Sequence, residues 1–302
     1  MIRPYRHNWR GYLFIAPATV YLALFAFFPM ILAGWMSLHR WHLLKDEHPF
    51  VGLANFTAMT QDPFFRNAVK NTLAYAVFTV PLGVITSLAV AVLVSRPLRG
   101  VGFFRTLYYI PAVSSQVAIS MVWIWILLPG EQGLINYCLG RLNAWLGADL
   151  PTSTNFLGRP GWAMAALVAM SLWIGLGPRM IIFLAGIQSI PETLYEAAAL
   201  DGCGTWRRFW YVTLPLLGPT TLFVTVTTTI ASFQLFTPVY MITHGGPRRT
   251  TDVVLYHIYK EAWQKFEIGM ASAQSYVLFA MVLAAAALQL WVMRRGLTEQ
   301  AE

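Results

Sequence analysis

The sequence predicts an all-α integral membrane protein that crosses the bilayer with six transmembrane helices. Of its 302 residues, 57% are hydrophobic and only 11% are charged, whereas soluble domains carry about 25% charged residues. The mean hydropathy of +0.55 agrees with this composition. Six apolar stretches are each long enough to cross a hydrocarbon core that is about 30 Å thick. A soluble enzyme and a disordered chain are therefore both disfavoured.

The six predicted spans are bounded mostly by charged or turn residues. Pro17 and Pro29 lie within the first span and predict a kink or a break there. This span is too long for the apolar part of a signal peptide, which runs to about 7–15 residues, so we expect it to remain in the mature chain. The predicted spans are 12–38, 71–95, 106–128, 161–187, 216–243 and 271–293.

Basic residues are denser on the side of the membrane that both termini share. Arg96, Arg99 and Arg105 occupy one short loop on that side, and Arg207 and Arg208 lie in another. Because loops rich in Lys and Arg stay in the cytoplasm, we expect both termini to be cytoplasmic. The net charge of +8 then follows from membrane topology and requires no nucleic acid.

The membrane interior is almost free of ionisable residues, since Arg179 is the one full charge within the predicted spans. A carrier driven by protons or sodium usually needs a buried carboxylate, and a membrane hydrolase needs a nucleophile with a base, or a metal. No lysine follows a glycine, so the phosphate-binding GxxxxGK[ST] loop is absent. The sequence therefore predicts no enzymatic activity, no catalytic residue and no metal site. A self-sufficient secondary carrier and an integral membrane enzyme are the two rival classes.

The loop between the fourth and fifth spans, residues 192–215, is here called the corner. Glu192 follows a proline and suits a helix start, and a helix-forming run continues to residue 200. Gly202 and Gly204 break that run. A second short helix is expected over 206–212, and Leu214-Pro215 is expected to end it. The corner thus consists of two short helices with a tight turn between them, held to the membrane at both ends.

The corner carries a motif with fixed spacing. Glu196-Ala197-Ala198 is followed after three residues by Gly202, after nine more by Val212, and after one more by Leu214-Pro215. This resembles the EAA signature of permease subunits of binding-protein-dependent ATP-binding-cassette importers, and only Val212 departs from it, replacing isoleucine. Other segments resemble the carbohydrate-uptake branch of that family, which includes maltose and glycerol-phosphate permeases. These segments are 50–56, 103–111, 185–191 and 244–247.

The resemblance implies a type I importer permease fold, with residues 1–302 as a single transmembrane domain and the corner as its cytoplasmic coupling loop. It implies four kinds of partner: a second homologous permease, two ATPase subunits that bind ATP and Mg²⁺, an extracytoplasmic solute-binding protein, and the lipid of a bacterial inner membrane. The chain itself would need no cofactor. The residues expected to couple to the ATPase are Glu196, Ala197, Ala198, Asp201, Gly202, Gly204, Leu214 and Pro215.

Arg179 requires an explanation, because an Arg at the centre of a membrane helix costs about 2.5–3.5 kcal/mol on insertion scales. Gly175, Gly177 and Pro178 precede it and could free carbonyls to line a cavity. Arg179 could hydrogen-bond a solute hydroxyl or phosphate. The alternatives are that its side chain extends toward the cytoplasmic side or pairs with another chain.

The fifth predicted span is rich in hydroxyls, and Thr228 and Ser232 lie four residues apart on one helical face. Such hydroxyls could bind a solute, or they could bond to their own helix or to a neighbouring one. In the maltose member of the family that this chain resembles, side chains of two helices hold the sugar. Alignment without gaps from the EAA segment makes Ser171, Gly175, Thr228 and Ser232 the counterparts of those sugar-binding positions. The resemblance implies a sugar, oligosaccharide or polyol as solute, with a glycerol-phosphate-type solute as the alternative. The candidate substrate-binding residues are Ser171, Gly175, Arg179, Thr228, Ser232 and Gln234.

Overall fold

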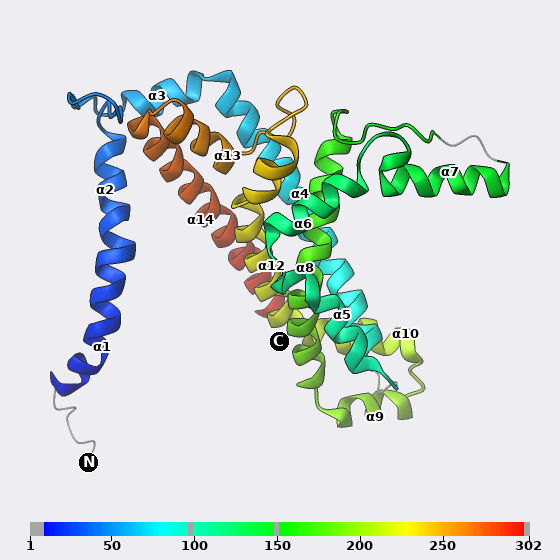
Figure 1. Ribbon diagram of the computed structural model, residues 1–302. Coiled ribbons are helices and arrows are strands. Elements are labelled where there is room, and N and C mark those ends of the chain that lie inside the picture. Colours follow the sequence, from blue (N-terminus) through cyan, green and yellow to red (C-terminus); the bar gives the residue numbers. More distant parts are fainter. Residues whose placement is uncertain (1–8, 96–98, 148–150, 299–302) are drawn as a thin grey trace, which may run out of the picture. The chain divides into compact units, whose positions relative to one another are not determined.

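The computed structural model describes residues 9–95, 99–147 and 151–298, and helices dominate it (Figure 1). Of the basic residues that predicted the topology, Arg96 lies outside the described residues. Contacts divide the chain into two compact units, residues 1–62 with 258–277 and residues 63–257 with 278–302. The single domain over 1–302 stays a prediction.

Within the described residues, four helices are long and apolar enough to cross a membrane. Two further pairs of helices pass the same test together, although each pair is bent at a short break, so the number of spans reaches six if each pair is one span. This agrees with the predicted all-α membrane fold. The four single candidates are Tyr12–Ser37, Pro63–Ser95, Trp162–Gln188 and Ile268–Val292.

The first unit begins with the amino-terminal span. A π-helical turn, Ala23–Phe27, lies directly before Pro29. Because proline has no amide hydrogen for the normal α-helical bond, the π turn accommodates the residue without ending the helix. The kink or break predicted at Pro29 is therefore a π-helical turn within a continuing helix. The helices of this unit are α1 (Trp9–Leu22), α2 (Phe28–Ser37), α3 (Ala54–Gln61), η5 (Lys260–Gln264) and the first part of α14 (Ile268–Thr298).

Hydrogen bonds to backbone carbonyls connect the segments of the first unit. The Tyr276 hydroxyl of α14 donates to the carbonyl of Met30 in α2 at 2.6 Å. The buried Asn55 amide of α3 donates to the carbonyls of Ser37 and His39 at 2.7 and 2.9 Å. The two Asn55 bonds satisfy an amide that would otherwise be costly to bury.

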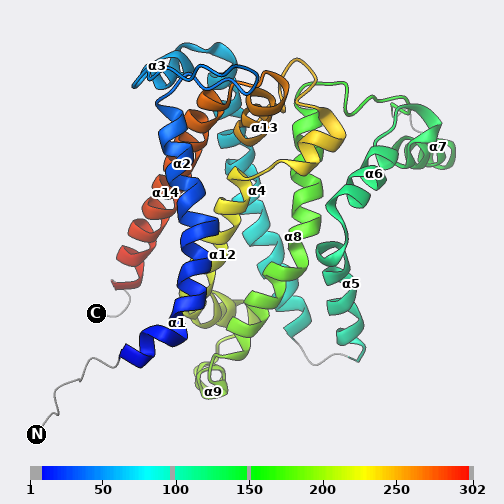
Figure 2. The same ribbon diagram turned by 60° about the vertical axis from the view of Figure 1, so that its left-hand side comes forward.

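The second unit is built around α8, which packs against α4 and α5 (Figure 2). Helix α12 packs on both α4 and α8. Apolar side chains, including Leu88, Phe183 and Val224, form a buried cluster between these helices. The helices of this unit are α4 (Pro63–Ser95), α5 (Val101–Val113), α6 (Gln116–Ile126), α7 (Leu134–Leu146), α8 (Trp162–Gln188), α9 (Glu192–Leu200), α10 (Thr205–Arg208), η3 (Phe209–Thr213), α11 (Leu214–Leu216), α12 (Gly218–Phe233), η4 (Val239–Thr243) and α13 (Val254–Tyr259), the last of which ends beyond the unit boundary.

The third predicted span, 106–128, is not one straight helix. Helices α5 and α6 meet at 100°, with extended backbone at Ser114. The Ser114 hydroxyl donates to the carbonyl of Ile110 at 3.0 Å, and side-chain bonds of this kind compete with continued helix. An apolar run therefore predicted the segment but not its bend.

The fifth predicted span, 216–243, is also wrong in its second half. Helix α12 ends at Phe233, and a separate π-helical turn follows Pro238. Pro238 cannot donate to the carbonyl of Gln234, and its ring clashes with that carbonyl in a continuous helix. The chain is consequently non-helical over residues 234–236.

Candidate functional site

The second unit contains a cavity of about 220 Å³ between α4, α8 and the end of α12. The six residues that the sequence predicted for substrate binding all line this cavity, although they come from two separate spans. They are Ser171, Gly175, Arg179, Thr228, Ser232 and Gln234.

Helical spacing explains how these residues meet. Ser171, Gly175 and Arg179 follow one another at intervals of four along α8, so they share a face. Thr228 and Ser232 have the same spacing on α12. Gln234 lines the cavity just beyond the end of α12.

Sequence reasoning missed the contribution of α4. Tyr75 and Thr79 line the cavity, and both are almost fully buried. Gln116, the first residue of α6, also lines it. The four-residue spacing of Tyr75 and Thr79 on an otherwise apolar span was the available signal, because two polar groups on one helical face suggest a polar environment.

Arg179 occupies a space that two glycines leave open. A Cβ added to Gly83 of α4 would lie 3.2 Å from the Arg179 Cζ, and one added to Gly175 would overlap the guanidinium, at 2.6 Å from Cζ. The Arg179 Nη2 donates to the carbonyl of Leu172 at 3.2 Å. Its Nε is buried and has no hydrogen-bond partner. The guanidinium is therefore closely confined but only partly satisfied.

The hydroxyls of α12 divide into two groups. Thr225, Thr229 and Ser232 donate to carbonyls one turn earlier in their own helix, at 2.7 to 2.9 Å. This matches the alternative in which membrane hydroxyls bond their own backbone. Among the described residues, the Thr228 hydroxyl forms no such bond, although Thr228 is buried and lines the cavity.

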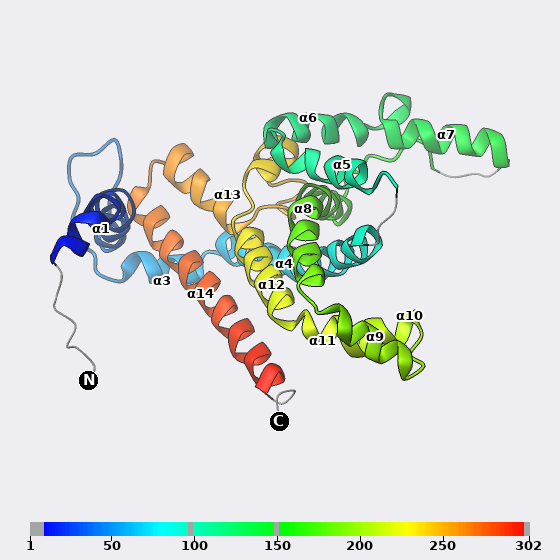
Figure 3. The same ribbon diagram turned by 90° about the horizontal axis from the view of Figure 1, so that it is seen from below.

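The corner forms the two short helices that the sequence predicted. Helix α9 ends at Leu200, and Gly202 follows with a φ of +75°, a conformation that favours glycine. The second arm runs through α10, η3 and α11, close to α9 (Figure 3). The Tyr195 hydroxyl lies 3.0 Å from the Thr213 hydroxyl and connects the two arms.

The residues predicted for coupling lie mostly on the surface of the corner. Glu196, Ala197, Asp201, Gly202 and Gly204 are exposed. The remaining three, Ala198, Leu214 and Pro215, are half-buried.

The predicted end of the second arm at Pro215 is wrong. The helical turn Leu214–Leu216 includes Pro215, and the chain bends by 67° only after it, before α12. The backbone is helical from Thr205 to Leu216, and the π-helical turn Phe209–Thr213 comes just before Pro215. This turn accommodates the proline without ending the arm, as Ala23–Phe27 does for Pro29.

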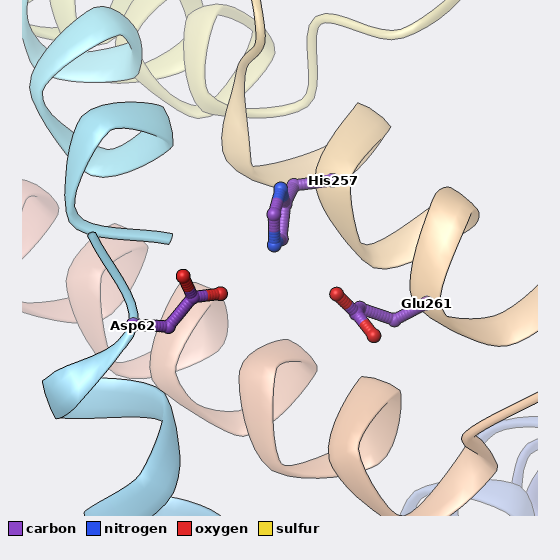
Figure 4. A group of neighbouring side chains, drawn as sticks. All are labelled: Asp62, His257 and Glu261. Atoms are coloured by element: carbon purple, nitrogen blue, oxygen red, sulfur yellow. The ribbon is translucent and has the colours of Figure 1, made fainter. Parts of the chain in front are cut away.

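Two carboxylates of the first unit, those of Asp62 and Glu261, lie near each other (Figure 4). Asp62 and Glu261 belong to the first unit, and His257 precedes Glu261 by one helical turn. Glu261 accepts from Lys265 at 2.5 Å, and His257 Nδ1 lies 3.4 Å from the Asp252 carboxylate. These partners account for the burial of both groups, and we assign no metal.

Comparisons with known proteins agree with this architecture. The family model described as "Binding-protein-dependent transport system inner membrane component" matches residues 80–295. The "sn-glycerol-3-phosphate transport system permease protein UgpA" of Agrobacterium fabrum is 33% identical over 279 residues, 92% of each chain. The "Probable ABC transporter permease protein YurN" of Bacillus subtilis is 33% identical over 290 residues, 95% of this chain and 97% of that one.

A solved structure shows the same fold. It is a chain of a bacterial alginate ABC transporter in complex with an alginate pentasaccharide-bound periplasmic protein. The TM-score is 0.82 at 23% identity, and the match covers 96% of each chain. This chain therefore belongs to the family of binding-protein-dependent transport system inner membrane components, and it is a membrane-embedded permease subunit of an ATP-binding-cassette importer rather than an enzyme.

Proposed function

We propose that this permease forms half of the translocation pathway of an importer for a carbohydrate or polyol, and that the solute is held in the cavity between α4, α8 and α12. The observation that carries the proposal is the convergence of the six residues chosen from sequence. Hydroxyl and amide groups from three spans point to a solute with several hydroxyls, since such groups give orientation and specificity in small-molecule sites.

The proposed partners are a second related permease, two ATPase subunits that bind ATP and Mg²⁺, and an extracytoplasmic solute-binding protein. Both termini and the corner would lie on the cytoplasmic side of the bacterial inner membrane. The exposed Glu196 and its neighbours would then meet an ATPase subunit. Closure of the two ATPase subunits on ATP would move the corner as a rigid body and favour the outward-open state, and hydrolysis would restore the inward-open state.

A glycerol-phosphate-type solute is the second candidate. It is favoured by the name of the Agrobacterium relative, a permease of sn-glycerol-3-phosphate transport. The cavity also contains a cation, Arg179, that a neutral sugar does not require.

Replacing Thr228 with valine tests the cavity. Thr228→Val keeps the shape of the side chain but removes a buried hydroxyl that has no hydrogen-bond partner in the described part of the chain. We expect the solute concentration for half-maximal uptake to rise about 3- to 10-fold, the effect of one neutral hydrogen bond. Uptake by the reconstituted importer with its own binding protein measures this.

The adjacent Thr227→Val is the matched control. Thr227 is exposed, and its hydroxyl donates to the Phe223 carbonyl of its own helix at 2.8 Å. We expect Thr227→Val to transport as the unmodified chain does. Equal behaviour of the two variants would contradict the assignment of the cavity.

A further inference from the structure

Arg179 is a charged group without an opposite charge. Among the described residues, no carboxylate forms an ion pair with it, and its hydrogen bond goes to the neutral carbonyl of Leu172. None of the residues that line the cavity is acidic. The Leu172 carbonyl and the cavity offset part of the cost of a cation in a membrane span, and an anion in the cavity would neutralise its charge.

The space around Arg179 fixes where such an anion would bind. Gly83 and Gly175 both approach the guanidinium so closely that a methyl group at either would crowd or overlap it. The glycines thus leave the space that the guanidinium occupies at the wall of the cavity. Arg presents five donors in a planar fork that can bind two oxygens of one phosphate or carboxylate, and only one of these donors has a hydrogen-bond acceptor among the residues that the structure describes.

The rest of the wall is neutral and polar. Tyr75, Thr79 and Gln116 approach from α4 and α6, and Thr228 and Ser232 from α12. Pro178 also leaves the carbonyl of Ile174 without its usual amide donor, and Ile174 lines the same cavity. These groups can bond the hydroxyls of a sugar or polyol, but they cannot neutralise a cation.

We propose that the cavity selects a hydroxylated solute that carries one anionic oxygen group, a phosphate or a carboxylate, and that Arg179 binds this group. This inference rests on the proposed function, because it assumes that the solute occupies the cavity. On this inference, Arg179 distinguishes charged solutes from neutral ones, and the surrounding hydroxyls recognise the hydroxyl groups of the solute.

Equilibrium binding to the whole importer in lipid nanodiscs tests the inference. The probes are glycerol 3-phosphate and glucuronate, with glycerol and glucose as their neutral counterparts. We expect the unmodified assembly to bind at least one anionic probe more tightly than its neutral counterpart. Arg179→Gln should weaken binding of that probe by at least about tenfold, equivalent to 1.4 kcal/mol, and change binding of the neutral probes less than twofold. The two anionic probes distinguish a phosphate from a carboxylate.

Two controls keep the result decisive. Arg179→Lys retains the charge without the planar fork and should weaken binding of the anionic probe less than Arg179→Gln does. Arg99→Gln removes an exposed loop charge and should leave the affinity for every probe unchanged. Basal ATP hydrolysis by each assembly reports whether it is folded. Equal weakening of charged and neutral probes by Arg179→Gln, no weakening of either, or no preference for an anion in the unmodified assembly would each overturn the inference. In those cases Arg179 pairs with another chain or stabilises the fold, while the Thr228→Val result still decides whether the cavity holds the solute.

Discussion

Gly202→Val is expected to reduce ATP-driven solute uptake about tenfold, because a positive φ costs a residue with a side chain about 1–2 kcal/mol and a β-branched one is a strong outlier there. Gly202 has a φ of +75°, and no atom lies within 4 Å of an added Cβ. The substitution therefore acts on the backbone turn and not through a clash. Uptake by reconstituted importer, with co-purification of the ATPase as a check on assembly, measures the effect.

Gly204→Ala is the matched control in the same turn. Gly204 has an extended backbone, with φ −68° and ψ 168°, and its added Cβ also meets open space. We expect Gly204→Ala to retain uptake within about twofold, and Gly202→Asn to lie between the two, since Asn tolerates the left-handed region better than other non-glycine residues. Uptake by Gly202→Val equal to that of Gly204→Ala would show that the geometry of the corner does not matter for coupling.

The second large effect is expected from Gly177→Leu. Gly177 of α8 is buried against the backbone of α5, where an added Cβ would lie 2.7 Å from the Cα of Tyr109 and would overlap the carbonyl of Tyr108. Small residues allow helices to approach this closely in membranes. Backbone atoms of α5 cannot move aside as the end of a flexible side chain can. We therefore expect the free energy of unfolding to fall by at least about 1–3 kcal/mol, and little correctly assembled importer to form.

Thermal unfolding of the purified assembly in detergent, together with the yield of monodisperse protein, measures this loss. Gly102→Ala, in α5, is the control, because nothing lies within 4 Å of its added Cβ. It should unfold at the same temperature as the unmodified protein or slightly above, since alanine favours helix over glycine. A stable Gly177→Leu assembly would contradict the close packing of α8 on α5.

Composition and apolar runs predicted the fold class because a membrane span is defined by its length and hydropathy alone. The same signal could not locate two interruptions of the helices. The bend at Ser114 depends on a local hydrogen bond of its hydroxyl, and the break after Phe233 depends on the effect of Pro238 on the preceding turn. Pro215 was misread for a related reason. A proline inside a helix can end it or be accommodated by a preceding π-helical turn, and the sequence does not show which applies.

The cavity was predictable in part. Arg179 stood out as a lone charge in an apolar span, and the spacing of Thr228 and Ser232 indicated a shared face. Tyr75 and Thr79 were missed because their neighbour in space, α8, is about a hundred residues away in sequence. The confinement of the guanidinium by Gly83 and Gly175 likewise depends on the packing of α4 against α8, which no local pattern specifies.

The central claim is that a separate ATPase opens and closes the cavity by moving the corner. The most direct measurement is the rate at which a cysteine at position 171 reacts with a membrane-impermeant thiol reagent added from the extracytoplasmic side. The two native cysteines, Cys138 and Cys203, are free and would be replaced by serine. ATP trapped on the ATPase subunits should raise the rate of labelling of Ser171→Cys by at least about tenfold, since it makes a minor outward-open state the major one, and Gly202→Val should abolish that increase. A labelling rate that is the same with and without trapped ATP would contradict the account.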